Sequence, residues 1–175
     1  LETFFALKEG GVINASRKLL VSPRLMHPSM IRLIEEEIAQ GENGFIRLKM
    51  NSITDKPLID KLIEASQAGV HIEMVVRGIC CLIAGVPGYT DNISIISIVG
   101  RFLEHSRIYI FGKGDRRRVY ISSADFMTRN QDRRVEVGCP VLSDELIAGF
   151  DAAFEAYAAA YLDGKPTGLA QDDMN

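Results

Sequence analysis

The sequence predicts an α/β fold in which a mixed β-sheet is flanked by helices. Three observations lead to this prediction. A strand, a helix and a second strand follow one another within residues 45–77, which is typical of a βαβ unit with parallel strands. Two β-type runs at 107–112 and 119–125 are joined by a short polar tip, as in an antiparallel hairpin. An alanine-rich run at 143–162 has the length and composition of a helix.

The first elements can be justified in chain order. Residues 17–23 form an apolar run closed by a proline, and we expect a strand there. From Pro28 to Gly41 isoleucines recur at helical spacing, and a proline suits the first helical turn. Residues 45–51 alternate between apolar and polar side chains, which predicts a strand.

The middle of the chain completes the βαβ unit. The run 54–69 has an apolar stripe at helical spacing, with Thr54 or Asp55 as its N-cap and Gly69 as its end. Residues 71–77 are rich in β-branched and apolar side chains and form the next strand. The two strands of this unit are therefore expected to be parallel.

The second half opens with a loop rich in Gly and Pro at 78–92. It follows the carboxyl end of a parallel strand, where α/β proteins place their ligand sites. We expect a strand at 93–100 and a short helix or turn at 101–106, before the hairpin. A strand at 133–141 and the final helix, capped by Ser143, follow it.

Length and composition indicate one globular domain in a chain of 175 residues. We place this domain at 17–162, with 1–16 as the tail of a preceding domain or a linker and 163–175 as a disordered tail. The chain does not begin with Met, so we interpret it as a piece of a longer protein. No apolar run approaches the roughly 18 residues that span a membrane, and there is no signal peptide. We expect a cytoplasmic protein without a transmembrane segment, and membrane association stays open.

Cysteine and histidine content argues against a metal site. The three cysteines show no C-x-x-C spacing, which favours a reducing compartment over a zinc site. The three histidines are isolated in the sequence, so a histidine-rich metal site is not expected. His27, beside a proline, and His71, at a strand start, are interpreted as structural.

The charge distribution has two interpretations. The net charge of −3 gives no indication of a nucleic-acid partner. However, residues 101–134 hold nine lysines and arginines against four acidic residues. This basic segment is either a solvated loop face, as we expect for the tip at 115–118, or an anion site.

Common phosphate and nucleophile motifs are absent from the sequence: it has no P-loop, no glycine-rich dinucleotide motif and no nucleophile elbow. What remains is a set of polar side chains near the ends of predicted strands. The set comprises Arg77, His105, Arg107, Ser123, Asp125, Arg129, Asn130, Arg134 and Glu136.

Residue chemistry alone leaves several of these roles open. His105 and Arg107 alternate along an extended chain, so they are expected to face the same side. A histidine among arginines and carboxylates can hold or transfer a proton near neutral pH, although a structural role for His105 is an equal alternative. Arg77 alone is equally compatible with an ordinary salt bridge. Glu136 is costly to bury and therefore needs a partner. The candidates are Arg77, Arg134 and His105.

Four stretches, in this order, together resemble the C-terminal region of the long-chain polyphosphate kinases: "KMNSITD", "ASQAGVHIEMVVRGICCLIAGVPG", "SIVGRFLEHSRIYIFGKG" and "VYISSADFMTRNQDRRVEVGCPV". The resemblance covers roughly residues 12–160. It implies reversible transfer of the terminal phosphate of ATP to polyphosphate, through a phosphohistidine and with Mg²⁺. It also implies a phospholipase-D-like fold, because the C-terminal domains of this family are similar to phospholipase D domains.

The phospholipase D superfamily uses an H-x-K motif followed by a second element, Gly/Ser-Ser-x-Asn/Asp. Here His105-Ser106-Arg107 matches the first motif with Arg in place of Lys, and residues 122–125 match the second. Such sites are built from two facing halves. The resemblance implies that the phosphorylated histidine and the Mg²⁺ ligands lie in the preceding domain, outside this chain.

The resemblance assigns roles to the polar set. It places the nucleotide-contacting arginine at Arg77, the second histidine of the two-half site at His105 and the strand glutamate at Glu136. His105 and Glu136 are then the catalytic candidates. Arg77, His105, Arg134 and Arg107 are the candidates for binding nucleotide or phosphate, and Arg134 is the weaker match. The supporting residues are Ser123, Asp125 and Asn130.

Three functions remain to be compared. The first is the C-terminal catalytic half of a polyphosphate kinase, inactive by itself, with ATP or ADP, polyphosphate and the preceding domains as partners. A homo-oligomer is implied for the whole enzyme. The second is one half of a phospholipase-D-like phosphodiesterase or nuclease, and Arg107 in place of Lys argues against it. The third is a non-catalytic module that binds nucleotide or polyphosphate.

Overall fold

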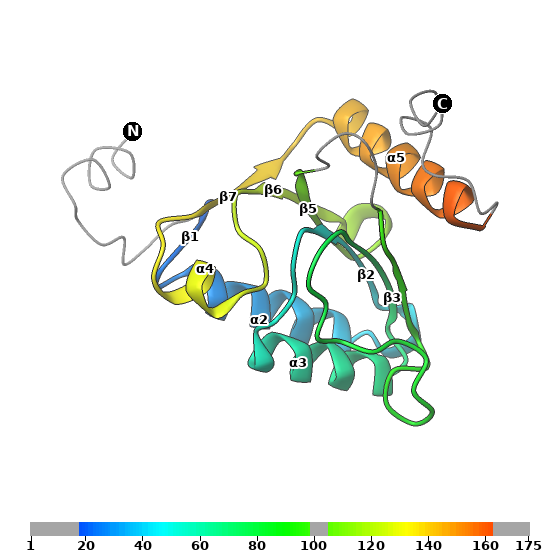
Figure 1. Cartoon of the computed structure of the whole chain (residues 1–175). Helices are drawn as coiled ribbons and strands as arrows, with labels where there is room; N and C mark the ends of the chain where they lie inside the picture. The colour runs from blue at the N-terminus through cyan, green and yellow to red at the C-terminus, as the bar shows by residue number, and fades with distance from the viewer. Residues whose placement is uncertain (1–17, 99–104, 163–175) are drawn as a thin grey trace, which may run out of the picture.

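The computed structural model describes residues 18–98 and 105–162, and there it shows a seven-stranded mixed sheet between helices (Figure 1). The strand order is β1-β7-β6-β5-β2-β3-β4. The strands are β1 (Leu20–Val21), β2 (Phe45–Met50), β3 (His71–Val76), β4 (Ile93–Ile96), β5 (Arg107–Phe111), β6 (Arg118–Ser122) and β7 (Val137–Val141). The helices are α2 (Met26–Ile38), α3 (Lys56–Gln67), α4 (Thr128–Asp132), α5 (Asp144–Leu162) and the 3-10 turns η1 (Gly41–Asn43) and η2 (Gly114–Arg116). The predicted fold class is confirmed.

The parallel half of the sheet is the predicted βαβ unit. Strands β2 and β3 pair in parallel with Phe45 opposite His71, and β4 extends the parallel set beside β3. Helix α3 connects β2 to β3. Of the two predicted caps it is Asp55 that caps α3, because its carboxylate accepts a hydrogen bond from the amide of Leu58 at 3.2 Å.

The antiparallel half contains the predicted hairpin. Strand β5 pairs antiparallel with both β2 and β6, and η2 forms the hairpin tip. Strands β7 and β1 continue this half, each antiparallel to its neighbour. Because β5 runs against β2, the start of β5 lies at the same edge of the sheet as the ends of β2 and β3. The end of β6 and the start of β7 reach that edge as well.

Several boundaries differ from the prediction. Strand β1 has two residues where a longer run was expected, and β7 begins at Val137 instead of 133. Helix α2 begins at Met26, ahead of Pro28, and α4 was not predicted at all. The predicted tails at 1–16 and 163–175, and most of the predicted turn at 101–106, lie outside the described residues.

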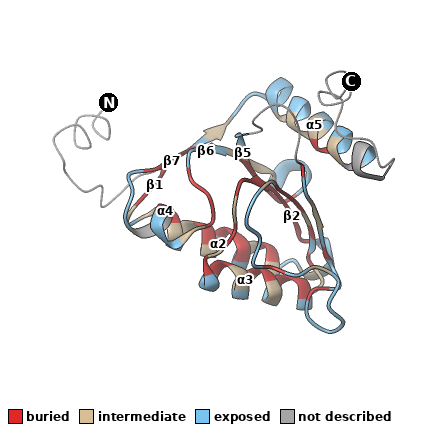
Figure 2. Cartoon of the chain, viewed as in Figure 1, coloured by how far each residue is buried: buried red, intermediate tan, exposed pale blue. Residues whose placement is uncertain are grey.

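Alternate residues of β5 supply the two hydrophobic cores on either side of the sheet. Tyr109 and Phe111 pack in the core formed with α2 and α3. Ile108 and Ile110 pack on the other face with Phe154 of α5. Figure 2 shows the buried residues concentrated between the helices and the sheet. Both faces of the central strand β5 are therefore covered.

Helix α5 is fastened to the sheet by a buried arginine of β2. The Arg47 guanidinium donates to Glu73 at 2.6 Å, to Asp151 at 3.4 Å and to Glu155 at 2.9 Å. It also lies over the Phe154 ring, 5.3 Å from its centroid. Burial opposes the charge of Arg47, but these carboxylates outweigh it and raise its pKa. Asp151 and Glu155 belong to α5, so Arg47 joins this helix to the sheet.

The arginine-rich hairpin tip is held by acidic residues. Arg116 contacts Glu37, Arg117 contacts Asp151, and Arg118 contacts Glu36. These basic side chains therefore form ion pairs within the domain. Across residues 18–98 and 105–162, no helix combines the length and apolarity that a membrane crossing requires.

Tyr109 links this core to the polar edge of the sheet. Its side chain is fully buried, and its hydroxyl donates to the carbonyl of Ala124. Burial raises the pKa of this hydroxyl, which keeps its proton for the bond. We predict that Tyr109→Phe lowers the free energy of unfolding by about 1–3 kcal/mol, because it leaves a buried carbonyl without a donor. Urea denaturation measures the change.

Tyr89 provides the matched control, because it lies in the loop before β4 and is 59% exposed. Tyr89→Phe is expected to stay within about 0.5 kcal/mol of the parent chain. Equal effects at the two positions would contradict the role of the Tyr109 hydroxyl.

Candidate active site

A polar cleft lies where the ends of β2, β3 and β6 meet the starts of β5 and β7. Its volume is about 590 Å³. Every residue of the predicted polar set lines it. The lining residues are Asn51, Ser52, Arg77, His105, Arg107, Ser123, Asp125, Arg129, Asn130, Arg134 and Glu136. Sheet topology thus gathers at one edge side chains that are far apart in the sequence.

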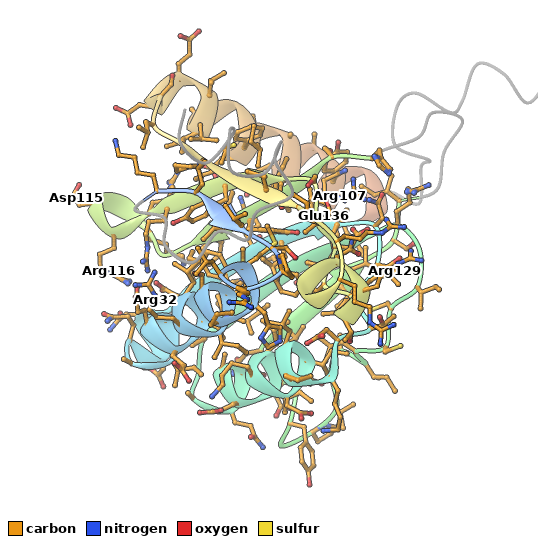
Figure 3. All side chains as sticks on the ribbon, turned by 90° about the vertical axis from the view of Figure 1, so that its left-hand side faces the viewer. Arg32, Arg107, Asp115, Arg116, Arg129 and Glu136 are labelled. Carbon is orange, nitrogen blue, oxygen red and sulfur yellow. The ribbon has the colours of Figure 1, made fainter. Side chains whose placement is uncertain are left out.

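Two lining residues were not predicted. Asn51 and Ser52 follow the end of β2, as Arg77 follows the end of β3, and the same strand-end rule would have found them. Figure 3 shows Arg107, Glu136 and Arg129 toward one end of the molecule, with the tip residues Asp115 and Arg116 toward the other.

Asp125 is the hub of the cleft. One of its carboxylate oxygens accepts from the Asn51 amide at 2.8 Å and from the Arg107 Nε at 3.1 Å. The other accepts from the Arg107 Nη2 at 3.0 Å. The side chain of Asn51 and the amide of Ser52 also reach it, at 3.3 and 3.4 Å. This single side chain therefore joins the end of β2 to the start of β5.

Electrostatics favour the ionised form of Asp125. Burial alone raises the pKa of a carboxyl group, and Asp125 is only 6% exposed. The hydrogen bonds from Arg107 and from the amides of Asn51 and Ser52 outweigh burial, and they hold the pKa of Asp125 below its ordinary value. The pair with Arg107 is a bidentate ion pair, which is the strongest geometry for such a contact.

The same network extends to Arg77. The Arg77 Nε donates to the Asn51 side-chain oxygen at 3.0 Å, while Asn51 itself is held by Asp125. This bond uses one of the five N–H donors of the guanidinium, and both terminal nitrogens are left for a ligand. Such a pair of nitrogens is suited to two oxygens of one phosphate.

His105 is held by Arg107. The Arg107 Nη1 lies 3.1 Å from the His105 Nδ1 and donates to the His105 carbonyl at 3.1 Å. Lys49, buried on β2, donates to the next residue, Ser106, at its hydroxyl (2.7 Å) and its carbonyl (3.2 Å). The segment that bears His105 is thus tied to the sheet by two cations. Arg101 and Glu104, which are close to His105 in the sequence, lie outside the described residues.

Glu136 has neutral partners. The sequence suggested Arg77, Arg134 or His105, but the Glu136 carboxylate accepts from the hydroxyl of Ser123 and from the Asn130 amide at 2.6 Å. Glu136 is 8% exposed, so these donors replace much of its lost hydration.

Asn130 is left with an unmet acceptor. Its amide nitrogen serves Glu136, and its buried Oδ1 has no hydrogen-bond partner within the described structure. The backbone of Asn130 is fixed, because its carbonyl accepts from the Ser22 hydroxyl at 2.5 Å. Its helix, α4, is also tied to the cap of α3, since the Thr128 hydroxyl donates to Asp55 at 2.9 Å. A rigidly held acceptor in a cleft is a place for a donor from a ligand or another domain.

Positive charge prevails in the cleft. Arg107 and Asp125 neutralise each other, which leaves Arg77, Arg129 and Arg134 against the carboxylate of Glu136. Arg129 and Arg134 are exposed, and no ion pair or hydrogen bond engages their side chains in the described part of the chain. The cleft therefore has the excess of positive charge that anion binding requires.

The other two histidines lie outside this cleft. The His27 Nε2 lies 3.2 Å from Asp55, and the His71 Nε2 lies 3.0 Å from Glu73. Each side chain thus has a carboxylate partner in the scaffold, as their structural interpretation requires.

Comparison with known proteins identifies a matching family and similar relatives. Residues 19–163 match the family model of the polyphosphate kinase C-terminal domain 2. The polyphosphate kinase of Bacillus cereus is 49% identical over 144 residues, which cover 81% of this chain and 20% of that protein. That of Staphylococcus epidermidis is 54% identical over 127 residues, covering 71% of this chain and 17% of the relative. The chain spans about a fifth of the length of the curated relatives it matches.

Two solved structures are also similar to this chain. The crystal structure of polyphosphate kinase from Porphyromonas gingivalis matches 87% of this chain and 24% of its own, with a TM-score of 0.80 and 40% identity. Nuc from Salmonella typhimurium, a phospholipase D family member, matches 81% of this chain and 93% of its own with a TM-score of 0.60. At 16% identity this second likeness concerns the fold, and the predicted phospholipase-D-like fold is confirmed.

The Asp125 network makes stability depend on pH. The pKa of Asp125 is lower in the folded chain than the roughly 3.9 of an unfolded aspartate. Its stabilisation is therefore complete above the unfolded-state pKa and is lost as pH falls through the folded-state pKa. We predict that Asp125→Asn lowers the free energy of unfolding by about 3 kcal/mol at neutral pH, the low end for breaking a buried ion pair. The deficit shrinks as the pH falls below about 3.9, because the unfolded parent chain then binds a proton that the folded Asp125 does not.

Urea denaturation of both chains across this pH range measures the deficit. Asp60→Asn is the control, since Asp60 pairs with Lys56 on the exposed face of α3 and little change is expected. A deficit that stays constant with pH would show that the charge of Asp125 is not the cause.

Proposed function

The chain belongs to the polyphosphate kinase family as its C-terminal domain 2, and we propose that its cleft is one half of that enzyme's active site. The reaction is the reversible transfer of the terminal phosphate of ATP to polyphosphate. The observation that carries the proposal is the convergence of the predicted residues in one cleft with an excess of cations. A phosphohistidine on the preceding domain would supply the other half.

Arg77 is proposed to bind a nucleotide phosphate. Phosphoryl transfer passes through a transition state whose charge spreads over the phosphate oxygens, so catalysis rests on placement and neutralisation. The two terminal nitrogens of Arg77 stand at the end of β3, and Asn51 fixes the base of the guanidinium. Arg134, and with it Arg129, adds cations for the further phosphates of nucleotide or polyphosphate.

His105 is proposed to act on the leaving oxygen. Its exposed ring lines the cleft, and its backbone is held at the start of β5. An imidazole there stabilises the developing charge by a hydrogen bond or gives up a proton, as a general acid does. The family resemblance implies that the phosphorylated histidine lies on the preceding domain, and neither His27 nor His71 lines the cleft.

Glu136 is proposed to orient a donor from the facing domain. Its carboxylate and the Asn130 Oδ1 form a pair of acceptors, and Ser123 and Asn130 fix the carboxylate in place. The unmet Oδ1 supports this role, because a buried acceptor costs about 1–3 kcal/mol unless a donor reaches it. A histidine or arginine side chain of the preceding domain provides such a donor.

Mg²⁺ does not fit this half of the site. The carboxylates of the cleft, Asp125 and Glu136, are both taken up by internal donors. No group of three or more His, Cys, Asp or Glu side chains suited to a metal ion occurs in the described residues. We place any Mg²⁺ ligands on the preceding domains, which we also propose as partners together with a homo-oligomeric assembly.

Kinetics of the complete enzyme test the proposal. We predict that His105→Ala lowers kcat by about 10²–10⁴-fold, the usual effect of losing a general acid or base. Arg77→Ala is expected to raise the KM for nucleotide, because it removes binding groups for the phosphate. The measurement is formation of polyphosphate from ATP in steady state, with circular dichroism to verify the fold.

Arg118→Ala is the control, since Arg118 pairs with Glu36 away from the cleft. Near-parent turnover in both cleft variants would refute the assignment. Hydrolysis of a phosphodiester by the isolated chain, lost in His105→Ala, would instead support the phosphodiesterase alternative. Binding of ATP without any transfer, even after the preceding domains are added, would support the binding module.

A further inference from the structure

We propose that Arg107 is a positioning residue that fixes the ring orientation and the tautomer of His105, and that it does not bind phosphate. Sequence similarity placed Arg107 among the phosphate-binding candidates. The catalytic consequence of this inference rests on the proposed function, whereas the tautomer of His105 does not.

The donors of Arg107 are nearly all in use. A guanidinium has five N–H donors. In Arg107 the Nε and the Nη2 each donate to Asp125, and the Nη1 is directed at the His105 Nδ1 and at the His105 carbonyl. Four of the five donors are therefore spent within the chain. Bidentate binding of a phosphate would break the pair with Asp125 or release His105.

The remaining arginines of the cleft differ in this respect. Arg77 spends one donor, on Asn51. Arg129 and Arg134 are exposed, and no hydrogen bond holds their side chains in the described residues. The side chain of Arg107 is 12% exposed, and its charge is already matched by Asp125. Ligand binding and positioning are thus divided between different arginines.

Contact with Arg107 determines where His105 holds its proton. Arginine donates hydrogen bonds and accepts none, so the His105 Nδ1 must be the unprotonated nitrogen when this bond forms. The proton of a neutral ring then lies on Nε2, at the other edge of the imidazole. The second bond, to the His105 carbonyl, holds ring and backbone with one guanidinium nitrogen. His105 is therefore presented as a donor with a fixed orientation.

A lysine cannot replace this arrangement. Its ammonium places three donors on a single nitrogen, whereas the guanidinium fork spreads its donors over three atoms. Asp125 occupies one side of the fork and His105 the other. Meanwhile Lys49 holds Ser106 independently, so a change at Arg107 is expected to release the ring while the start of β5 stays in place.

Imidazole nitrogen NMR tests the inference in this chain directly. The sequence has three histidines. In a ¹⁵N-labelled chain, the signals lost in His27→Gln and in His71→Gln belong to those two residues, and the remaining signals belong to His105. At a pH where the rings are neutral, we expect His105 to show an unprotonated Nδ1 and a protonated Nε2. In Arg107→Lys the two ¹⁵N shifts of His105 are expected to move toward each other as both tautomers become populated. Arg118→Lys, remote from the cleft, is expected to leave them unchanged.

The outcomes decide the proposal. A protonated Nδ1 in the parent chain overturns it, and this result needs no variant to fold. Unchanged His105 shifts in a folded Arg107→Lys chain overturn it as well, and Arg107→Gln provides a second variant if the lysine chain does not fold.

Kinetics of the complete enzyme separate positioning from phosphate binding. Arg107→Lys is expected to lower kcat by about 10–100-fold, as for other residues that orient a functional histidine, with KM for nucleotide nearly unchanged. A rise in KM with kcat retained would instead identify Arg107 as a phosphate ligand. If the enzyme proves not to be a kinase, the NMR result still stands, so the two proposals fail separately.

Discussion

The bidentate pair of Asp125 and Arg107 is the interaction on which the polar cleft depends. A carboxylate at 6% exposure is stable only if its hydration is replaced, and here charged and amide donors replace it. Those donors come from the end of β2 and the start of β5. Satisfying one buried charge thus fixes two strand ends relative to each other, and Arg77 and His105 take their positions from these ends.

From Asp125 the network branches in two directions. One branch passes through Asn51 to Arg77, and the other passes through Arg107 to His105. Arg77, the proposed phosphate ligand, and His105, the proposed acid, are therefore both positioned by Asp125. Phosphoryl transfer requires such a fixed separation, because its catalysis consists largely of placement. On the other side of the cleft, Glu136 has an independent support in Ser123 and Asn130.

What could be predicted from the sequence is governed by short-range patterns. The βαβ unit at 45–77 and the hairpin follow from periodicity and turn composition, and strand-end logic found most of the cleft. Helix α4 could not be found this way, because its five residues carry no apolar period and are held by tertiary bonds such as that from Thr128 to Asp55. The partners of Glu136 could not be predicted from the sequence either. Reasoning from charge pointed to cations, whereas neutral side chains that the fold brings close supply the hydrogen bonds.

The hydrogen bonds of the cleft close long segments of chain, and this has a consequence for the order of folding. Asn51 and Asp125 are 74 positions apart, and Ser22 and Asn130 are 108 apart. Contacts at such separations carry a large loop-closure entropy and form late. A chain that has built only its parallel half possesses Arg77 but neither Asp125 nor His105 in place. The complete cleft therefore exists only in the finished fold, and a ligand that contacts Arg77 and His105 together would bind only after the antiparallel half has closed.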